Sequence, residues 1–318
     1  MKYFSIVMLM MFAVLANAQP VKKYGALKVD GTQLVDKNSE PAVLRGVSLG
    51  WHNFWPRFYN AETVNWLIDD WHINVIRAAM GIELENAYLS NPEFAKKVVK
   101  AVVDAAIKRD IYVIIDWHSH NLNQKEALEF FTEMAQQYGE YPHVIYEIFN
   151  EPDYESWKDV KSYSVALINS IRKYDSDNII LVGSPHWDQD LDIVADDPLE
   201  GQENIMYTLH YYAATHSDSL RMKGDYAIEK GIPLFISECA GMQANGDGAL
   251  DYNEWQKWIN WAEEKKISWI VWSIADKNET CSMLTPIAGS YGNWNNTQLK
   301  ESGTKTKELL IRYNTDHY

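Results

Sequence analysis

The chain has 318 residues, with 44 acidic against 29 basic side chains and a formal net charge of −15. This surplus of negative charge repels phosphate backbones and anionic membrane surfaces, so we expect no nucleic-acid partner and favour a neutral one. With only two cysteines, the chain is neither a disulfide-built scaffold nor the holder of a multi-cysteine metal site.

Residues 1–18 are predicted to be a secretory signal peptide, because Lys2 precedes an apolar run at 4–15 and small residues at 16–18. An uncleaved amino-terminal anchor is the alternative. No later segment offers about 20 uncharged apolar residues, the length that crosses a bilayer. We therefore expect a secreted or periplasmic protein without membrane contact once the signal is removed, in which residues 19–318 form one domain.

Short apolar runs alternate with longer helical stretches, which predicts repeated β/α units around a parallel sheet. The repeat is about thirty residues, the size of one βα unit. Eight such units close a (β/α)8 TIM barrel, the predicted fold. The strands are predicted to begin near Pro41, Asn74, Tyr112, His143, Ile179, Asn204, Pro233 and Ser268.

The intervening helices are predicted from the spacing of apolar residues. Phe94, Val98, Val102 and Ala106 recur every four residues and predict one buried helix face. Residues 26–38 predict a small hairpin that covers the barrel floor. An open doubly wound sheet, the competing architecture, would need a Gly-rich turn after the first strand, which this chain lacks.

Reactive groups in such barrels lie at the carboxyl ends of the strands. Two glutamates, Glu151 and Glu238, end the fourth and seventh predicted strands and are expected to face one mouth from opposite sides. Glycoside hydrolysis uses such a pair, at a separation of about 5 to 5.5 Å for retention and wider for inversion. The sequence leaves that distance open. Other strands bring ionisable or aromatic groups to the same rim: Arg77, Asp116, His118, His210, Tyr212 and Trp272.

The ordered motifs closely resemble glycoside hydrolase family 5, and in particular its bacterial endo-β-1,4-glucanases. The motifs are Asn74-Val-Ile-Arg77, Ile115-Asp-Trp-His118, Tyr146-Glu-Ile-Phe-Asn150-Glu151-Pro152, His210-Tyr-Tyr212, Ser237-Glu238 and Trp272-Ser273. The resemblance implies a (β/α)8 catalytic domain, a retaining double displacement on a polysaccharide or oligosaccharide, and neither metal nor organic cofactor. We expect the enzyme to act as a monomer.

The same resemblance implies residue roles. Glu151 corresponds to the acid/base, for which a raised pKa is expected, and Glu238 to the nucleophile. Asn150 corresponds to a ligand of the sugar 2-hydroxyl, and Arg77 and Tyr212 to the groups that hold the nucleophile ionised. Further substrate-binding positions are His118, Trp187, His210, Trp272, Lys277 and Glu279, with Trp51, Phe54 and Trp55 as weaker stacking candidates.

Structural alternatives stand beside these roles. Arg77 could pair with a barrel carboxylate, each histidine could be a satisfied core residue, and Trp272 could be plain core. A zinc site built from the histidines lacks a metal-binding spacing. Where many family members have a histidine after the first strand, this chain has Gly50. Either His52 serves from a shifted loop or that contact is missing.

The two cysteines follow neighbouring strands, Cys239 after the seventh and Cys281 after the eighth. Because neighbouring strands bring their loops together, we favour a disulfide, which would stabilise the fold by about 3 to 4 kcal/mol. Two unpaired buried thiols are the alternative.

The predicted function is that of a retaining endo-β-1,4-glucanase on cellulose-like glucans. Two alternatives remain: the same mechanism on mannan, xyloglucan or mixed-linkage β-glucan, and a carbohydrate-binding barrel that has lost catalysis.

Overall fold

A computed structural model describes residues 19–315 of the chain. The predicted signal peptide lies outside the described residues. Among the residues described, no helix is both long and apolar enough to cross a membrane.

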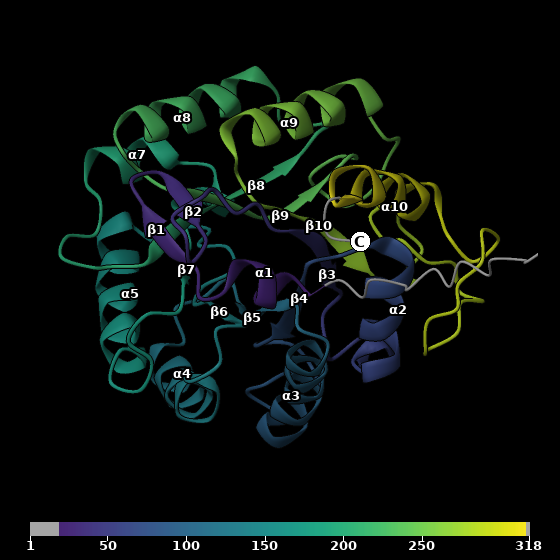
Figure 1. The fold of residues 1–318 in the computed structure, drawn as a ribbon, viewed down its shortest axis with the longest axis horizontal. Helices are drawn as coiled ribbons and strands as arrows, with labels where there is room; N and C mark the ends of the chain where they lie inside the picture. Colours follow the sequence, from purple (N-terminus) through teal and green to yellow (C-terminus); the bar gives the residue numbers. More distant parts are fainter. Residues whose placement is uncertain (1–18, 316–318) are drawn as a thin grey trace, which may run out of the picture.

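Eight parallel strands close a barrel in the order β10-β3-β4-β5-β6-β7-β8-β9, which confirms the predicted fold (Figure 1). Seven of the predicted starts lie within one residue of the observed ones, and the first strand begins at Arg45 rather than near Pro41. The strands are β3 Arg45–Leu49, β4 Val75–Gly81, β5 Tyr112–His118, β6 Val144–Glu147, β7 Ile180–Val182, β8 Ile205–Tyr212, β9 Leu234–Ala240 and β10 Trp269–Ile274.

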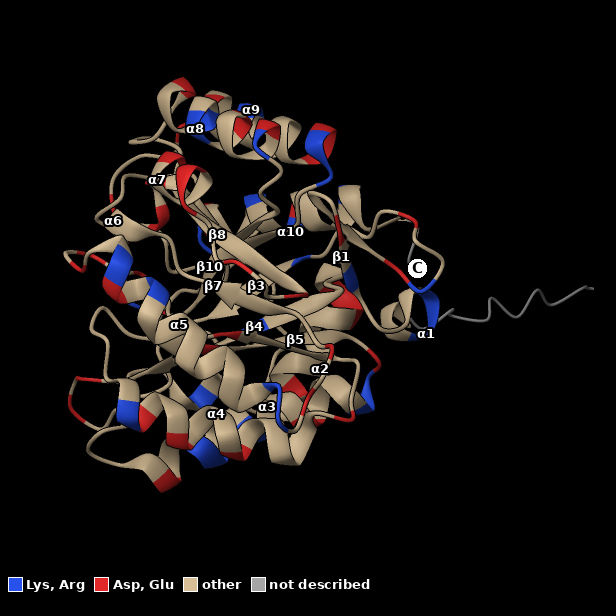
Figure 2. Ribbon diagram, turned by 90° about the vertical axis from the view of Figure 1, so that its left-hand side faces the viewer, with Lys and Arg blue, Asp and Glu red and all other residues tan. Residues whose placement is uncertain are grey.

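The main helices surround the barrel and carry charged residues of both signs (Figures 1 and 2). Asn60, Ser156 and Asp251 cap the first free backbone N–H groups of three of them, α2, α5 and α9. The helices between and after the strands are α2 Ala61–Trp71, α3 Pro92–Lys108, α4 Gln124–Tyr138, α5 Trp157–Ile171, α6 Pro185–Asp188, α7 Leu191–Asp196, α8 Asp218–Glu229, α9 Tyr252–Lys265 and α10 Glu301–Tyr313.

The buried face of α3 differs from the predicted one. Val102 and Ala106 are buried as expected, but Phe94 and Val98 are only half-buried, at the edge of the packed face. A strict four-residue spacing drifts around a helix of 3.6 residues per turn, so Ala95 takes the inward place beside the barrel.

The amino-terminal segment covers the barrel floor, as predicted. Helix α1 Pro20–Tyr24 precedes an antiparallel hairpin of β1 Lys28–Asp30 and β2 Gln33–Val35. Val21, Leu27 and Leu34 pack in one apolar cluster with residues at the amino ends of the barrel strands. The opposite end of the barrel, where the strands finish, is therefore the open one.

The predicted disulfide is wrong in this structure, because both cysteines are free. Side chains alternate along β9, so Glu238 faces the mouth while Cys239 faces the helices and packs in the cluster that holds Tyr211. Cys281 belongs to a different cluster at the mouth, where its thiol donates to Glu279 at 3.2 Å. The loops do approach each other, but the two sulfurs lie on opposite faces of the barrel wall.

We expect alkylation under denaturing, non-reducing conditions to label both cysteines, while the native protein reacts slowly at each. Cys239 is fully buried and Cys281 is 2% exposed, and burial raises the pKa of the Cys239 thiol to about 12. Mass spectrometry counts the labels, and a reductant should leave the midpoint of thermal unfolding unchanged. A midpoint that falls on reduction would show a bridge instead.

Candidate active site

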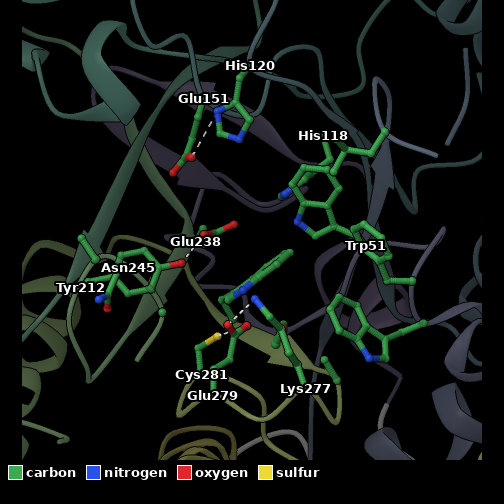
Figure 3. A pocket seen from close by; sticks show the side chains of 18 residues that line it. Trp51, His118, His120, Glu151, Tyr212, Glu238, Asn245, Lys277, Glu279 and Cys281 are labelled. Carbon is green, nitrogen blue, oxygen red and sulfur yellow. Dashed lines mark hydrogen bonds and ion pairs between the residues drawn. The ribbon is translucent and has the colours of Figure 1, made fainter. Parts of the chain in front are cut away.

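A cavity of about 420 Å³ opens at the carboxyl ends of the strands, and both glutamates face it (Figure 3). A second hollow of about 330 Å³ shares Glu151 and Tyr212 with it. Together they form a cleft that extends to both sides of Glu151. The first part is lined by Trp51, Phe54, Trp55, His118, Glu238, Trp272, Lys277 and Glu279, and the second by Trp187, Gln189, His210 and His216.

Glu238 lies near the carboxyl end of β9, and both of its carboxylate oxygens accept hydrogen bonds. The Tyr212 hydroxyl donates to Oε1 at 2.6 Å, and Arg77 Nη1 donates to Oε2 at 3.0 Å. Burial and the charge of Glu238 raise the pKa of Tyr212 well above its usual value, so this hydroxyl keeps its proton and acts as a donor. The carboxylate is thereby fixed in one orientation toward the cavity.

Arg77 is fully buried at the centre of a network of acids. It makes two hydrogen bonds to Glu147, at 2.7 and 3.0 Å, and lies 3.0 Å from Asp116. It also donates to Asn150 Oδ1 at 2.6 Å. Arg77 therefore contacts both kinds of partner that were considered for it. One guanidinium binds barrel carboxylates and Glu238 at the same time.

Glu151 follows β6 and faces Glu238 across the cleft. One carboxylate oxygen of Glu151 lies within 4.8 Å of one of Glu238. His210 Nδ1 contacts Glu151 Oε1 at 2.9 Å, and His120 Nδ1 lies 3.7 Å from Oε2. This short approach fits the retaining arrangement, with carboxyl groups about 5 to 5.5 Å apart, rather than the inverting one, where they are about 6.5 to 9.5 Å apart.

The expected rise in the pKa of Glu151 is wrong for the ligand-free protein. Burial raises this pKa, but the hydrogen bond and charge of His210 outweigh burial, and the pKa lies below its usual value. Burial opposes a charge on His210 as well, yet Asp188, Glu147 and Glu151 raise the pKa of His210 well above its usual value. The proton between the two residues therefore rests on the imidazole, and the pair titrates as a unit.

His118 and Trp272 form one wall of the cleft. Their rings stack at 5.0 Å with an angle of 4° between planes, and Trp51 meets His118 edge-on at 4.6 Å. His118 Nδ1 bonds Asp116 at 2.8 Å. Burial and Arg77 lower the pKa of His118 to about 3, so the imidazole that lines the cleft is neutral.

His52 does not replace the histidine that many family members have at the position of Gly50. Its side chain is fully buried, does not line the cleft, and accepts a hydrogen bond from Gly81 N–H at 3.1 Å. Burial lowers the pKa of His52 to about 4, as expected for a structural imidazole. The structure therefore contradicts the alternative in which His52 serves from a shifted loop.

Five site residues were not singled out by the sequence analysis: Glu147, His120, Asp188, Gln189 and His216. Glu147 could have been found from its position on β6, two residues after Ile145. Side chains two residues apart along a strand face the same side, and Ile145 packs inside the barrel near its floor. His120 and Gln189 lie on loops, where no periodicity reports direction. Asp188 stands in a turn whose backbone shape the sequence does not reveal.

Three side chains, Glu151, His210 and Glu238, come close enough to share a metal ion among the described residues. Their atoms already have hydrogen-bond partners. His210 Nε2 forms a hydrogen bond with the Ser237 hydroxyl at 2.9 Å, and Glu238 accepts hydrogen bonds from Arg77 and Tyr212. The guanidinium of Arg77 beside them repels a cation. This donor set fits proton transfer better than metal binding.

Comparisons with known proteins agree with this geometry. Residues 35–278 match the profile described as Cellulase (glycosyl hydrolase family 5). The chain is 42% identical to an endoglucanase of Clostridium saccharobutylicum over 97% of this chain and 71% of the other, and 43% identical to endoglucanase Z of Dickeya dadantii over 83% and 62%. It thus spans about two thirds of the length of these relatives.

Solved structures are similar over nearly the whole chain. A structure from Cytophaga hutchinsonii has a TM-score of 0.92 at 42% identity, covering 94% of this chain and 98% of the other. The catalytic domain of Thermobifida fusca endoglucanase Cel5A has a TM-score of 0.87 at 33% identity, covering 92% and 99%. A variant of that domain was solved in complex with cellotetraose.

Proposed function

Because this chain belongs to glycoside hydrolase family 5, the cellulases, we propose that it hydrolyses internal β-1,4 bonds of cellulose-like glucans, with Glu238 as nucleophile and Glu151 as acid/base. The observation that carries the proposal is the pair of carboxylate oxygens within 4.8 Å of each other at the floor of an aromatic cleft. We also propose that residues 19–318 form one catalytic domain that is exported and acts as a monomer.

In the first step, a Glu238 oxygen attacks the anomeric carbon as the glycosidic bond breaks. Glu151, protonated, gives its proton to the leaving oxygen, and the sugar becomes an ester of Glu238. Burial of Glu151 by the bound glucan excludes water and raises its proton affinity, which offsets the lowering by His210. In the second step Glu151 takes a proton from water, whose oxygen attacks the anomeric carbon; the bond from that carbon to Glu238 breaks and the carboxylate is restored.

Asn150 supports the proposed binding of the sugar 2-hydroxyl. Arg77 donates to its Oδ1, which orients the amide. The buried Nδ2 has no hydrogen-bond partner among the described residues. Since a buried amide donor without a partner is costly, a substrate hydroxyl that accepts from it is bound with a gain in free energy.

The cleft supports cleavage within a chain rather than at its end. Trp51, Trp55 and Trp272 line one side of the glutamate pair, and Trp187 lines the other. Aromatic faces on both sides offer stacking surfaces to sugars before and after the broken bond. The uncharged glucan also suits a protein with a net charge of −15.

Hydrolysis of cellotetraose followed by proton NMR tests the proposal. We expect the β-anomer of the new reducing end to appear first, because two successive displacements at the anomeric carbon retain configuration. On a polysaccharide panel, carboxymethylcellulose should release reducing ends faster than mannan or xyloglucan. First appearance of the α-anomer would refute the mechanism, and faster release from mannan would refute the substrate.

A further inference from the structure

A buried carboxyl behind the acid/base pair takes no part in the mechanism above. Asp188, at the end of α6, is fully buried. The Ser184 backbone N–H and the Thr208 hydroxyl, at 2.7 Å, both donate to its Oδ1. Its Oδ2 has no hydrogen-bond partner among the described residues, but it lies 3.3 Å from Nδ1 of His210.

The backbone takes a strained path to place this carboxyl. His186, Trp187 and Asp188 have consecutive φ values of 57°, 56° and 57°, in the left-handed region. Side chains with a Cβ avoid this region, and such strain persists where the surrounding structure requires it. The turn sets Trp187 in the cleft and Asp188 beneath His210, so the same strained segment serves both positions.

Asp188 and Glu151 share one nitrogen. His210 Nδ1 lies 2.9 Å from Glu151 Oε1 and 3.3 Å from Asp188 Oδ2, whereas Nε2 faces Ser237 at 2.9 Å and Glu147 at 3.8 Å. A protonated Glu151 has less need of a donor at Oε1. The Nδ1–H of His210 can then donate to Asp188 Oδ2 instead. A neutral side chain at position 188 would not offer it a negatively charged oxygen.

We propose that Asp188 is a positioning residue for the acid step: acting through His210, it is the alternative acceptor for the Nδ1–H and lets Glu151 hold a proton as general acid. This inference rests on the proposed function. An ionised Asp188 balances the charge of the imidazolium, so that Glu151 experiences less positive charge and the Glu151–His210 pair binds its proton more tightly.

The remaining charges near the pair have other partners. Glu147 and Asp116 lie against Arg77, Glu238 is held by Arg77 and Tyr212, and the low pKa of His118 leaves that ring neutral. His120 approaches Glu151 from the cleft side at 3.7 Å. The cation within ion-pair distance of Asp188 among the described residues is His210.

Burial raises the pKa of Asp188 well above its usual value, although His210 opposes this. Its charge therefore develops late as the pH rises. For Asp188 to act as proposed, it must be ionised on the alkaline side of the activity profile, where loss of the proton from the Glu151–His210 pair ends acid catalysis. That limb is where the effect of Asp188 can be measured.

The test compares Asp188→Asn with the unchanged protein by kcat/KM against pH, on cellotetraose and on 2,4-dinitrophenyl β-cellobioside. The amide keeps an oxygen for Ser184 and Thr208 but removes the negative charge. The pair then loses its proton at lower pH, so the alkaline limb on cellotetraose should move down by about 1 pH unit. On the dinitrophenyl substrate, whose leaving group needs no proton, the limb should not move.

Asp190→Asn is the matched control. Asp190 lies two residues further on and pairs with Lys223 at 2.7 Å, outside the cleft, so its profile should match that of the unchanged protein. If Asp188→Asn fails to fold, Thr208→Val replaces it. Loss of this donor to Oδ1 makes Asp188 harder to ionise and should move the limb in the same direction by less.

A folded Asp188→Asn protein whose alkaline limb on cellotetraose stays in place overturns the proposal. So does an equal shift on both substrates, because the effect would then not pass through acid catalysis. Failure of the proposed function has a different signature: the unchanged protein would release no reducing ends at any pH. The two failures are therefore distinguishable.

Discussion

Replacing Glu238 by alanine is expected to lower turnover of carboxymethylcellulose by at least about 10⁴-fold, the scale on which loss of a nucleophile is felt. The reason is geometric: no other carboxylate among the described residues contacts both Arg77 and Tyr212 while facing Glu151 across the cleft. Without Glu238 the sugar cation has no covalent partner, and the remaining protein can only bind the glucan.

The variant should still fold, so that its inactivity is interpretable. Arg77 keeps its two hydrogen bonds to Glu147 and its contact with Asp116, and the buried cation therefore retains counter-charges. Circular dichroism and binding of cellotetraose test this. Glu264→Ala, an exposed position on α9, is the matched control and should have normal activity.

Added azide distinguishes loss of the nucleophile from general damage. In the cavity left by the Glu238→Ala change, the small anion can attack the anomeric carbon of an activated cellobioside once, giving an α-glycosyl azide of inverted configuration. Mass spectrometry and NMR identify that product. Turnover of carboxymethylcellulose above about one hundredth of normal would contradict the assignment of Glu238.

Replacing Glu151 by glutamine should lower kcat/KM on cellotetraose by about 10²- to 10⁴-fold, the contribution of a positioned general acid. The amide can still accept from His210 Nδ1, so the local packing is kept. The loss in the first step should be far smaller with a dinitrophenyl leaving group, which departs without a proton. Equal losses of kcat/KM on both substrates would contradict the acid/base role.

The pH dependence of the unchanged enzyme follows from the same pair. His210 has a raised pKa and Glu151 a lowered one, so the proton that they share is present below the raised value and is lost as the pH rises through it. The alkaline limb of kcat/KM should therefore lie above the ordinary range of histidine. In Glu151→Gln on cellotetraose this limb should disappear, because no acid remains to lose its proton.

The sequence was sufficient to predict the (β/α)8 barrel and the position of the two glutamates at its mouth. Strand alternation and helix periodicity are local properties, and they report which residues face inward before any distance is known. Once Glu151 and Glu238 are placed at the ends of the fourth and seventh strands, closure of the barrel brings them to one mouth. The ordered motifs then select the chemistry, which the comparisons support.

Properties that depend on the distance between residues far apart in the sequence could be obtained only from the tertiary structure. The separation of the two carboxyls, the lowered pKa of Glu151 and the free thiols of Cys239 and Cys281 all depend on atoms brought together by closure of the barrel. Because side chains alternate along β9, Cys239 faces the helices although its neighbour Glu238 faces the mouth of the barrel.

Asp188 shows the same limit most clearly. Nothing in the residue types around it reveals three left-handed residues in succession or a carboxyl beneath His210. The sequence alone determined which strands carry the chemistry, because side-chain direction repeats along the chain. The tertiary structure decided which charges meet, because electrostatic energy depends on distance and burial, neither of which is encoded in local spacing.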